Sequence, residues 1–157
     1  MRIIKLALIS FLFFFVLLTI MSLFIPSHVR ISRAINIAST NQKAMLLVED
    51  TTEWRKWHPL FKESSIATVL GSNKVTWRTI TKTDSLFVMS FQQENKEPVT
   101  NSWQLHRLAS SDSTALQWYM DFQLKWYPWQ KFGGLFYEKT YGTMMEQGLN
   151  DLKNAAQ

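Results

Sequence analysis

Three histidines, His28, His58 and His106, are the side chains most able to titrate near neutral pH. They lie far apart along the chain, and no two have the i, i+4 spacing by which one helix face binds a metal ion. The chain has no cysteine, which rules out disulfides, thiolate catalysis and zinc sites with sulfur ligands. The sequence therefore predicts no metal site.

The carboxylates are also dispersed. Asp121 lies in the middle of a predicted strand but on its polar face, whereas Glu94, Glu97 and Asp112 fall near predicted turns. The sequence shows no Ser/His/Asp order, glycine-rich phosphate loop or close carboxylate pair. We therefore predict no catalytic residue and no cofactor.

Large apolar side chains form the strongest pattern, with seven Trp and eleven Phe in 157 residues. A cavity lined by aromatic and Met side chains would suit a sterol, a fatty acid or an aromatic molecule, because Met adapts its shape and Trp offers a wide flat surface. A filled core explains the same pattern equally well. The residues predicted to line such a cavity are Trp77, Phe87, Met89, Trp103, Trp118, Met120, Tyr141 and Met145.

Trp54 and Trp57 stand just before His58 and Pro59. They are three residues apart, so a helical turn points both the same way. They could form an entrance lid to the cavity or fasten a short helix to the end of the sheet, and we favour the fastening role. An exposed position or a cap contact suits His58 better than the role of a catalytic base.

Period-two alternation predicts the strands that position these side chains. It is longest over residues 115–126, where Leu116 and Trp118 alternate with Gln117 and Tyr119. Such alternation indicates one buried and one wet face. Shorter alternations predict strands at 29–37, 66–70, 74–80, 84–94 and 99–108, with a tight hairpin at 71–73.

Residues 132–153 predict a long amphipathic helix, because Tyr141, Met145 and Leu149 recur at four-residue steps opposite a charged face. Residues 42–49, preceded by side chains that can cap a helix, predict a shorter one. A helix with a broad apolar face needs an apolar surface to cover, and an antiparallel sheet supplies one. The predicted class is therefore α+β.

Residues 6–25 form an apolar run long enough to span a bilayer core. Its 15 Leu, Ile, Phe and Val residues favour insertion by very roughly 5 to 9 kcal/mol. A cleaved signal peptide is the alternative, but the run exceeds the usual length and Phe24, Ile25 and Pro26 make a poor cleavage site. We predict an uncleaved single-pass anchor, with residues 1–5 as a basic tail, 26–28 as a linker and 29–157 as one domain.

The distribution of charge gives weaker evidence on membrane orientation and on binding partners. Arg2 and Lys5 precede the apolar run and favour a cytoplasmic N-terminus with the domain on the extracytoplasmic side, although Arg30 and Arg33 weaken this inference. After residue 25, 15 basic residues stand against 12 acidic ones without a long basic run. We expect membrane contact through the N-terminal helix and no nucleic-acid binding, and the sequence identifies no protein partner.

The order of strand, two short helices, antiparallel strands and long C-terminal helix is a helix-grip arrangement. The chain also has three motifs, which are the strand 29–37, Trp54-x-x-Trp57-His58-Pro59 and the segment 141–153. With these motifs, the arrangement resembles the polyketide cyclase/dehydrase and lipid-transport family, the START-like or Bet v 1-like group of the SRPBCC superfamily. This resemblance covers about residues 29–153. It implies a curved sheet wrapped around the C-terminal helix and a deep cavity for hydrophobic small molecules. That family's sheet usually has seven strands, and the sequence indicates six.

We therefore expect a membrane-anchored domain that binds a hydrophobic small molecule or lipid without catalysing a reaction. A cyclase- or aromatase-like enzyme is one alternative, and it requires at least two polar side chains inside the cavity with a perturbed acid or base among them. An interaction module with a filled core and no ligand is the other.

Overall fold

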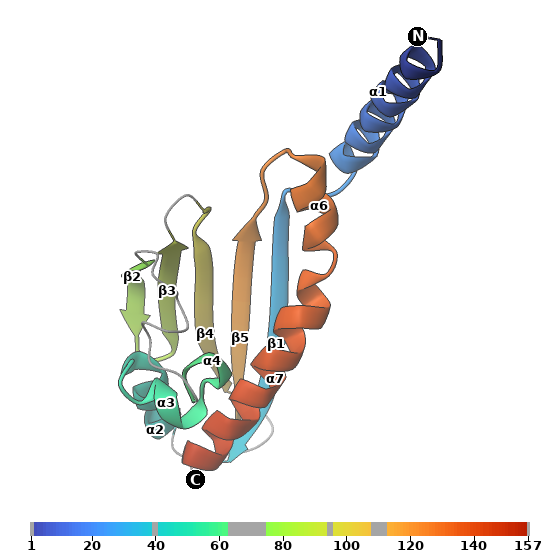
Figure 1. Cartoon of the computed structure of the whole chain (residues 1–157). Helices are drawn as coiled ribbons and strands as arrows, with labels where there is room; N and C mark the ends of the chain where they lie inside the picture. Colours follow the sequence, from blue (N-terminus) through green and yellow to red (C-terminus); the bar gives the residue numbers. More distant parts are fainter. Residues whose placement is uncertain (1, 39–40, 63–74, 94–95, 108–112, 157) are drawn as a thin grey trace.

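The computed structural model describes residues 2–38, 41–62, 75–93, 96–107 and 113–156. An antiparallel sheet carries helices on one of its faces, and an apolar helix projects from one end of the domain (Figure 1). The predicted α+β class and the helix-grip arrangement are confirmed.

The described part of the sheet has five strands in the order β1-β5-β4-β3-β2, so the first strand of the chain pairs with the last. The predicted strand at 66–70 and the hairpin at 71–73 lie outside the described residues. The strands are β1 (His28–Ala38), β2 (Val75–Thr83), β3 (Leu86–Gln93), β4 (Val99–Arg107) and β5 (Ser113–Gln123).

The alternation on β5 determines which of its faces is buried. Leu116, Trp118 and Met120 are buried, while the residues between them keep partial contact with solvent. Trp118 lies opposite Trp103 on β4 and Arg33 on β1, so these three side chains share the face that the helices cover. The strict period of two thus places the large aromatic residues in one layer.

Helices cover that face in two groups. The short helices gather at the end of the sheet away from the projecting helix, and the long C-terminal helix lies along the β1 side (Figure 1). Met145, Leu149 and Leu152 of the long helix are buried, as its apolar stripe predicts. The helices are α2 (Asn41–Glu49), α3 (Trp54–Trp57), α4 (Pro59–Lys62) and α7 (Tyr137–Ala156).

The helix predicted at 132–153 is divided in the structure. A short helix, α6 (Pro128–Gly134), comes first, and α7 begins only after Leu135 and Phe136. Gly133 and Gly134 weaken the helix at this point. The turn closes with short-range bonds from Leu135 N to Phe132 O at 3.2 Å and from Phe136 N to Gly133 O at 3.1 Å. The break leaves α6 beside the projecting helix while α7 follows the sheet.

Arg33 of β1 ties the sheet to α7. Its Nε donates to Glu146 Oε1 and its Nη2 donates to Glu138 Oε1, each at 2.6 Å. Gly142 lies beneath the guanidinium, and a Cβ at that position would collide with it. The glycine therefore allows the arginine to lie flat against the helix and reach both glutamates.

Replacing Arg33 with methionine should lower the free energy of unfolding by roughly 1 kcal/mol, because it removes two partly exposed ion pairs and keeps an apolar stem. Arg30→Met is the matched control. The Arg30 side chain is 58% exposed beside Asp121, so its loss should cost only a few tenths of a kcal/mol. Urea unfolding of both variants measures the difference, and equal losses would contradict the role given to Arg33.

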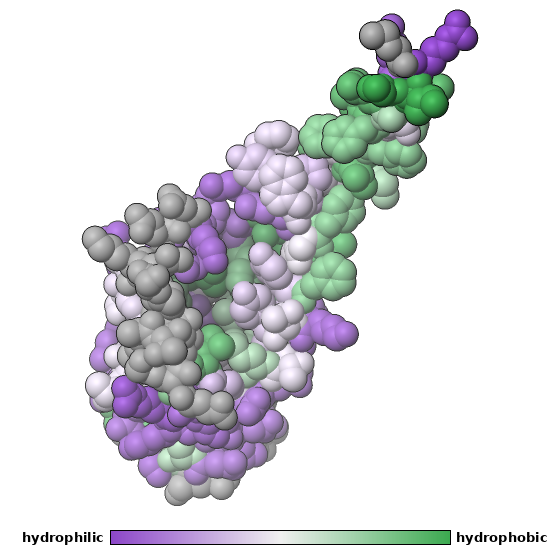
Figure 2. Space-filling view, viewed as in Figure 1, coloured by the Kyte–Doolittle hydropathy of each residue, from purple (hydrophilic) through white to green (hydrophobic). Residues whose placement is uncertain are grey.

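The projecting helix is α1 (Arg2–Leu23), and its side chains are exposed along nearly all of its length. Its 22 residues rise about 33 Å, which matches a bilayer core of about 30 Å. Among the described residues it is the one helix long and apolar enough to cross a membrane. Figure 2 shows its hydrophobic surface standing clear of the more polar domain.

Candidate functional site

Four tryptophans fill the interior near the short helices, and we call them the tryptophan cluster: Trp54, Trp57, Trp103 and Trp118. All are fully buried. The ring centroids of Trp103 and Trp118 lie 5.3 Å apart, and those of Trp54 and Trp103 lie 5.6 Å apart. Trp57 also contacts Trp118, with 5.9 Å between ring centroids. Both tryptophans of α3 therefore pack on the sheet, and their fastening or entrance role stays a prediction.

Three of the four indole N–H groups in the tryptophan cluster have partners among the described residues. Trp54 Nε1 donates to Val48 O at 2.8 Å, and Trp57 Nε1 donates to Leu47 O at 2.9 Å. Trp118 Nε1 donates to Asn101 Oδ1 at 3.0 Å. Hydrogen bonds of this kind fix the orientation of buried rings and join α2 to the cluster. This end of the domain is accordingly a packed, specific core.

His58 belongs to the same core. Its ring stacks on Trp54 with 5.2 Å between centroids, and its Nδ1 accepts a hydrogen bond from Leu60 N at 3.3 Å. Burial lowers the pKa of His58 to about 3, so the ring is neutral at physiological pH. The cap contact that the sequence suggested for His58 is present, and the exposed position is not.

The residues predicted to line a cavity all belong to or pack against the hydrophobic core. Trp77 and Tyr141 are half-buried, and the Trp77 ring contacts Phe91 at 4.7 Å between centroids. The structure brings the set together, and its role in ligand binding stays a prediction. The buried members are Phe87, Met89, Trp103, Trp118, Met120 and Met145.

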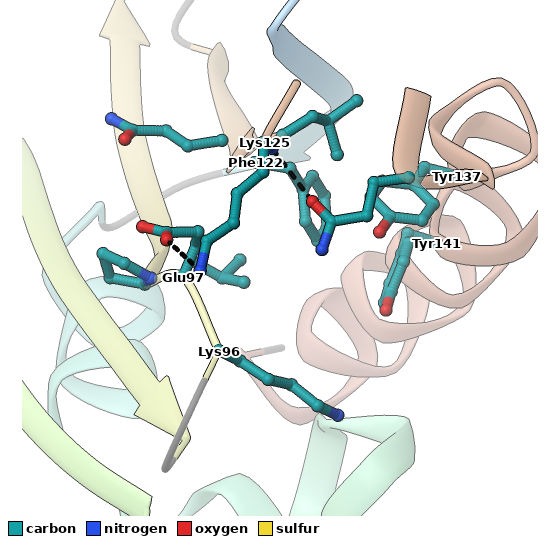
Figure 3. A pocket seen from close by; sticks show the side chains of 11 residues that line it. Lys96, Glu97, Phe122, Lys125, Tyr137 and Tyr141 are labelled. Carbon is teal, nitrogen blue, oxygen red and sulfur yellow. Dashed lines mark hydrogen bonds and ion pairs between the residues drawn. The ribbon is translucent and has the colours of Figure 1, made fainter. Parts of the chain in front are cut away.

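A pocket of about 330 Å³ opens between the sheet and the helices at the end nearest α1. Of the residues predicted to line a cavity, Tyr141 is the one that borders it. Its walls come from the β3–β4 connection, the end of β5 and the first turns of α6 and α7 (Figure 3). The lining residues are Lys96, Glu97, Pro98, Val99, Phe122, Gln123, Leu124, Lys125, Gln130, Tyr137 and Tyr141.

One wall of the pocket is aromatic. Phe122 lies 4.7 Å from Tyr137 and 4.8 Å from Tyr141 between ring centroids. The three rings combine a flat apolar surface with two phenol groups, which suits a ligand with a hydrophobic body and a polar end. Burial, with a smaller effect from Tyr137, raises the pKa of Tyr141. Its phenol therefore stays protonated at neutral pH and can donate a hydrogen bond.

The facing rim is polar. Lys125 Nζ pairs with Glu97 Oε1 at 3.1 Å, and the Lys125 backbone N–H donates to Gln130 Oε1 at 2.9 Å (Figure 3). Lys96 extends from the same side. With two lysines and one glutamate, the rim carries an excess of one positive charge. The arrangement can hold an amphiphile whose polar end is neutral or anionic.

Several pocket residues are not among those predicted from the sequence to line a cavity. Phe122 and Tyr137 lie on the predicted buried faces of a strand and a helix, so periodicity could have identified them. Lys96 and Gln130 lie in a connection and a short helix without a periodic signal. Only the folded chain brings them beside Tyr141.

Asp121 lies away from this pocket on the outer face of β5, as expected. Its carboxylate accepts from Arg30 Nε at 2.6 Å and lies 3.1 Å from His28 Nε2. Within the described ranges, no three His, Asp or Glu side chains are placed to hold a metal ion.

No family model and no curated protein matches this sequence. Solved structures are similar to it in fold. The hypothetical protein jhp0584 from Helicobacter pylori has a TM-score of 0.58 and 12% identity over 82% of this chain and 88% of its own. Protein SA2116 of unknown function from Staphylococcus aureus has a TM-score of 0.57 and 9% identity over 82% and 93%.

The di-domain aromatase/cyclase StfQ of the steffimycin biosynthetic pathway is also similar, with a TM-score of 0.59 and 9% identity. The match covers 82% of this chain and 50% of StfQ, so this chain spans about half of that protein. At these identities the likeness shows the fold alone. Their likeness agrees with the helix-grip arrangement of the described residues.

Proposed function

We propose that this chain is a membrane-anchored domain that binds a hydrophobic small molecule or a lipid in the pocket beside Tyr141. The observation that carries the proposal is the position of the pocket at the α1 end of the domain. Leu124 lines the pocket, and its N–H donates to Ser27 O, 2.7 Å away, just after α1. A pocket with an aromatic wall so close to an anchor would lie next to a reservoir of apolar ligands.

The size and lining of the pocket narrow the ligand class. A volume of about 330 Å³ is at the low end of the range for small-molecule sites. It suits a single acyl chain or a flat aromatic molecule better than a phospholipid with two chains. The phenols of Tyr137 and Tyr141 and the rim lysines favour a ligand with a neutral or anionic polar end.

The cellular orientation is part of the same proposal. With Arg2 and Lys5 held in the cytoplasm, the domain and its pocket would face the extracytoplasmic side. The pocket would then take its ligand from the outer leaflet of the membrane that α1 crosses.

Photocrosslinking of the full chain in nanodiscs tests the binding site. A fatty acid with a diazirine in its acyl chain should label peptides from the end of β5 and the start of α7, as well as α1. Val99→Trp should obstruct the pocket. A loss of about 1.4 kcal/mol in the binding free energy lowers the affinity for the ligand about tenfold. Labelling of β5 and α7 should fall by about that factor while labelling of α1 stays constant.

Val88→Trp is the matched control. Val88 is also a half-buried valine, but it lies between Phe87 and Met89 on β3 and so points to the other face of the sheet. Labelling of β5 and α7 should match the unmodified chain in this variant. If these segments are unlabelled in the unmodified chain, or if Val99→Trp leaves their labelling unchanged, the pocket is not the binding site.

A further inference from the structure

We propose that exposed apolar side chains around α6 form a collar that lies in the interfacial layer of the bilayer. The inference rests on the anchoring part of the proposed function and adds a second membrane contact to it. The collar consists of Phe24, Trp126, Trp129, Leu135 and Phe136, which are each between 60% and 85% exposed.

These five side chains come from segments that meet at the α1 end of the domain. Phe24 follows α1, Trp126 follows β5, Trp129 lies in α6, and Leu135 and Phe136 separate α6 from α7. Large exposed apolar side chains that gather in one place usually mark an interaction surface. Tryptophan in particular concentrates where a membrane meets water, because its ring is apolar and its N–H is polar.

Lys131 sets the depth of the collar. Its Nζ donates to Ile25 O at 2.7 Å and to Ser27 Oγ at 2.6 Å, and the side chain is buried. Helix α6 is therefore held level with the residues where the apolar run of α1 ends. When α1 spans the hydrocarbon core, this level coincides with the headgroup region.

The same contacts make the connection between anchor and domain stiff. Lys131 and the bond from Leu124 to Ser27 join α6 and β5 to the segment after α1, and α6 also packs on α1. Gln130 precedes Lys131 and lines the pocket. A collar in the interfacial layer would thus hold the pocket against the membrane surface, where a lipid-like ligand can enter without crossing bulk water.

The absence of native cysteine allows a direct test with single-cysteine variants of the full chain in liposomes. A nitroxide attached at Trp129→Cys or Phe136→Cys reports its depth through its relative accessibility to oxygen and to a water-soluble nickel complex. Leu18→Cys in α1 marks the bilayer interior, and Leu46→Cys, at an exposed position of α2, marks water. The collar sites should show an oxygen-to-nickel ratio severalfold above that of Leu46 and below that of Leu18.

The possible outcomes distinguish the membrane anchor from the collar. If the collar sites match Leu46 while Leu18 lies in lipid, the collar is wrong and the anchor stands. If Leu18 itself is accessible to the nickel complex, both the anchor and the collar are wrong. If the collar sites are shielded from oxygen and nickel alike, a protein surface covers them and the bilayer does not.

A second measurement uses the fluorescence of the native tryptophans in place of an attached nitroxide. Lipids brominated near the top of the acyl chain should quench part of the tryptophan emission of the full chain in nanodiscs. The double variant Trp126→Phe and Trp129→Phe should lose that quenched part. The four tryptophans of the cluster are buried inside the domain, and the seventh, Trp77, packs on Trp54 and Phe61 at the β2 edge of the sheet. Equal fractional quenching with and without the substitutions would overturn the collar.

Discussion

Replacing Trp118 with alanine should lower the free energy of unfolding of the domain by about 3 to 5 kcal/mol. Trp118 has no exposed surface, contacts Trp57 and Trp103, and donates its N–H to Asn101. Alanine would leave a large cavity and an unpaired amide oxygen in a buried site. Urea unfolding followed by near-ultraviolet circular dichroism measures the loss.

Trp126→Ala provides the matched control, since Trp126 is 62% exposed and the substitution should cost well under about 1 kcal/mol. A loss for Trp118→Ala as small as that for Trp126→Ala would mean that Trp118 lines an open space. The ligand site would then extend into the tryptophan cluster.

Acidification should destabilise the domain through His58. Its folded pKa of about 3 lies below its ordinary value of 6.5, so between these values the unfolded chain binds more protons than the folded one. The contribution of the neutral ring is fully present above pH 6.5 and is lost as the pH falls towards 3. The linkage amounts to about 2 kcal/mol at pH 5 and about 3 kcal/mol at pH 4.

His58→Asn should remove this part of the pH dependence, because asparagine keeps an acceptor for the Leu60 N–H and does not titrate. His106→Gln is the control, as His106 is exposed. The measurement is the slope of unfolding free energy against pH in each variant, since His58→Asn also lowers stability at every pH. Identical slopes in the unmodified chain and in His58→Asn would show that folding does not lower the pKa of His58.

Most of the fold could be predicted from residue periodicity. The alternation that places Leu116, Trp118 and Met120 on one side of a strand depends only on the pleat, and the structure buries all three. The division of the C-terminal helix could not be predicted in the same way. Leu135 and Phe136 continue an apolar pattern, and the position of the break depends on how α6 packs against α1.

The pocket was harder to predict than the core. Periodicity shows which side chains turn inward, but it does not distinguish a filled interior from an open one. The tryptophans of α3 fill the interior near Trp103 and Trp118, whereas at the other end Tyr141 borders an open pocket. That difference depends on contacts between segments far apart in the sequence.

The tyrosines of the pocket also bear on the enzymatic alternative. A cyclase-like reaction would need polar side chains that converge in the cavity and an acid or base with a shifted pKa. Tyr137 and Tyr141 both line the pocket, and the raised pKa of Tyr141 keeps its phenol protonated. These groups suit hydrogen bonding to a bound ligand, which is the function we propose.

Native mass spectrometry of the full chain released from nanodiscs tests the central claim most directly. We predict that one apolar molecule remains bound to each chain, that Val99→Trp removes it and that Val88→Trp retains it. This pattern would place the molecule in the pocket beside Tyr141 and identify its chemical class by mass. An unmodified chain that carries no bound molecule, or one whose bound molecule survives Val99→Trp, would contradict the account.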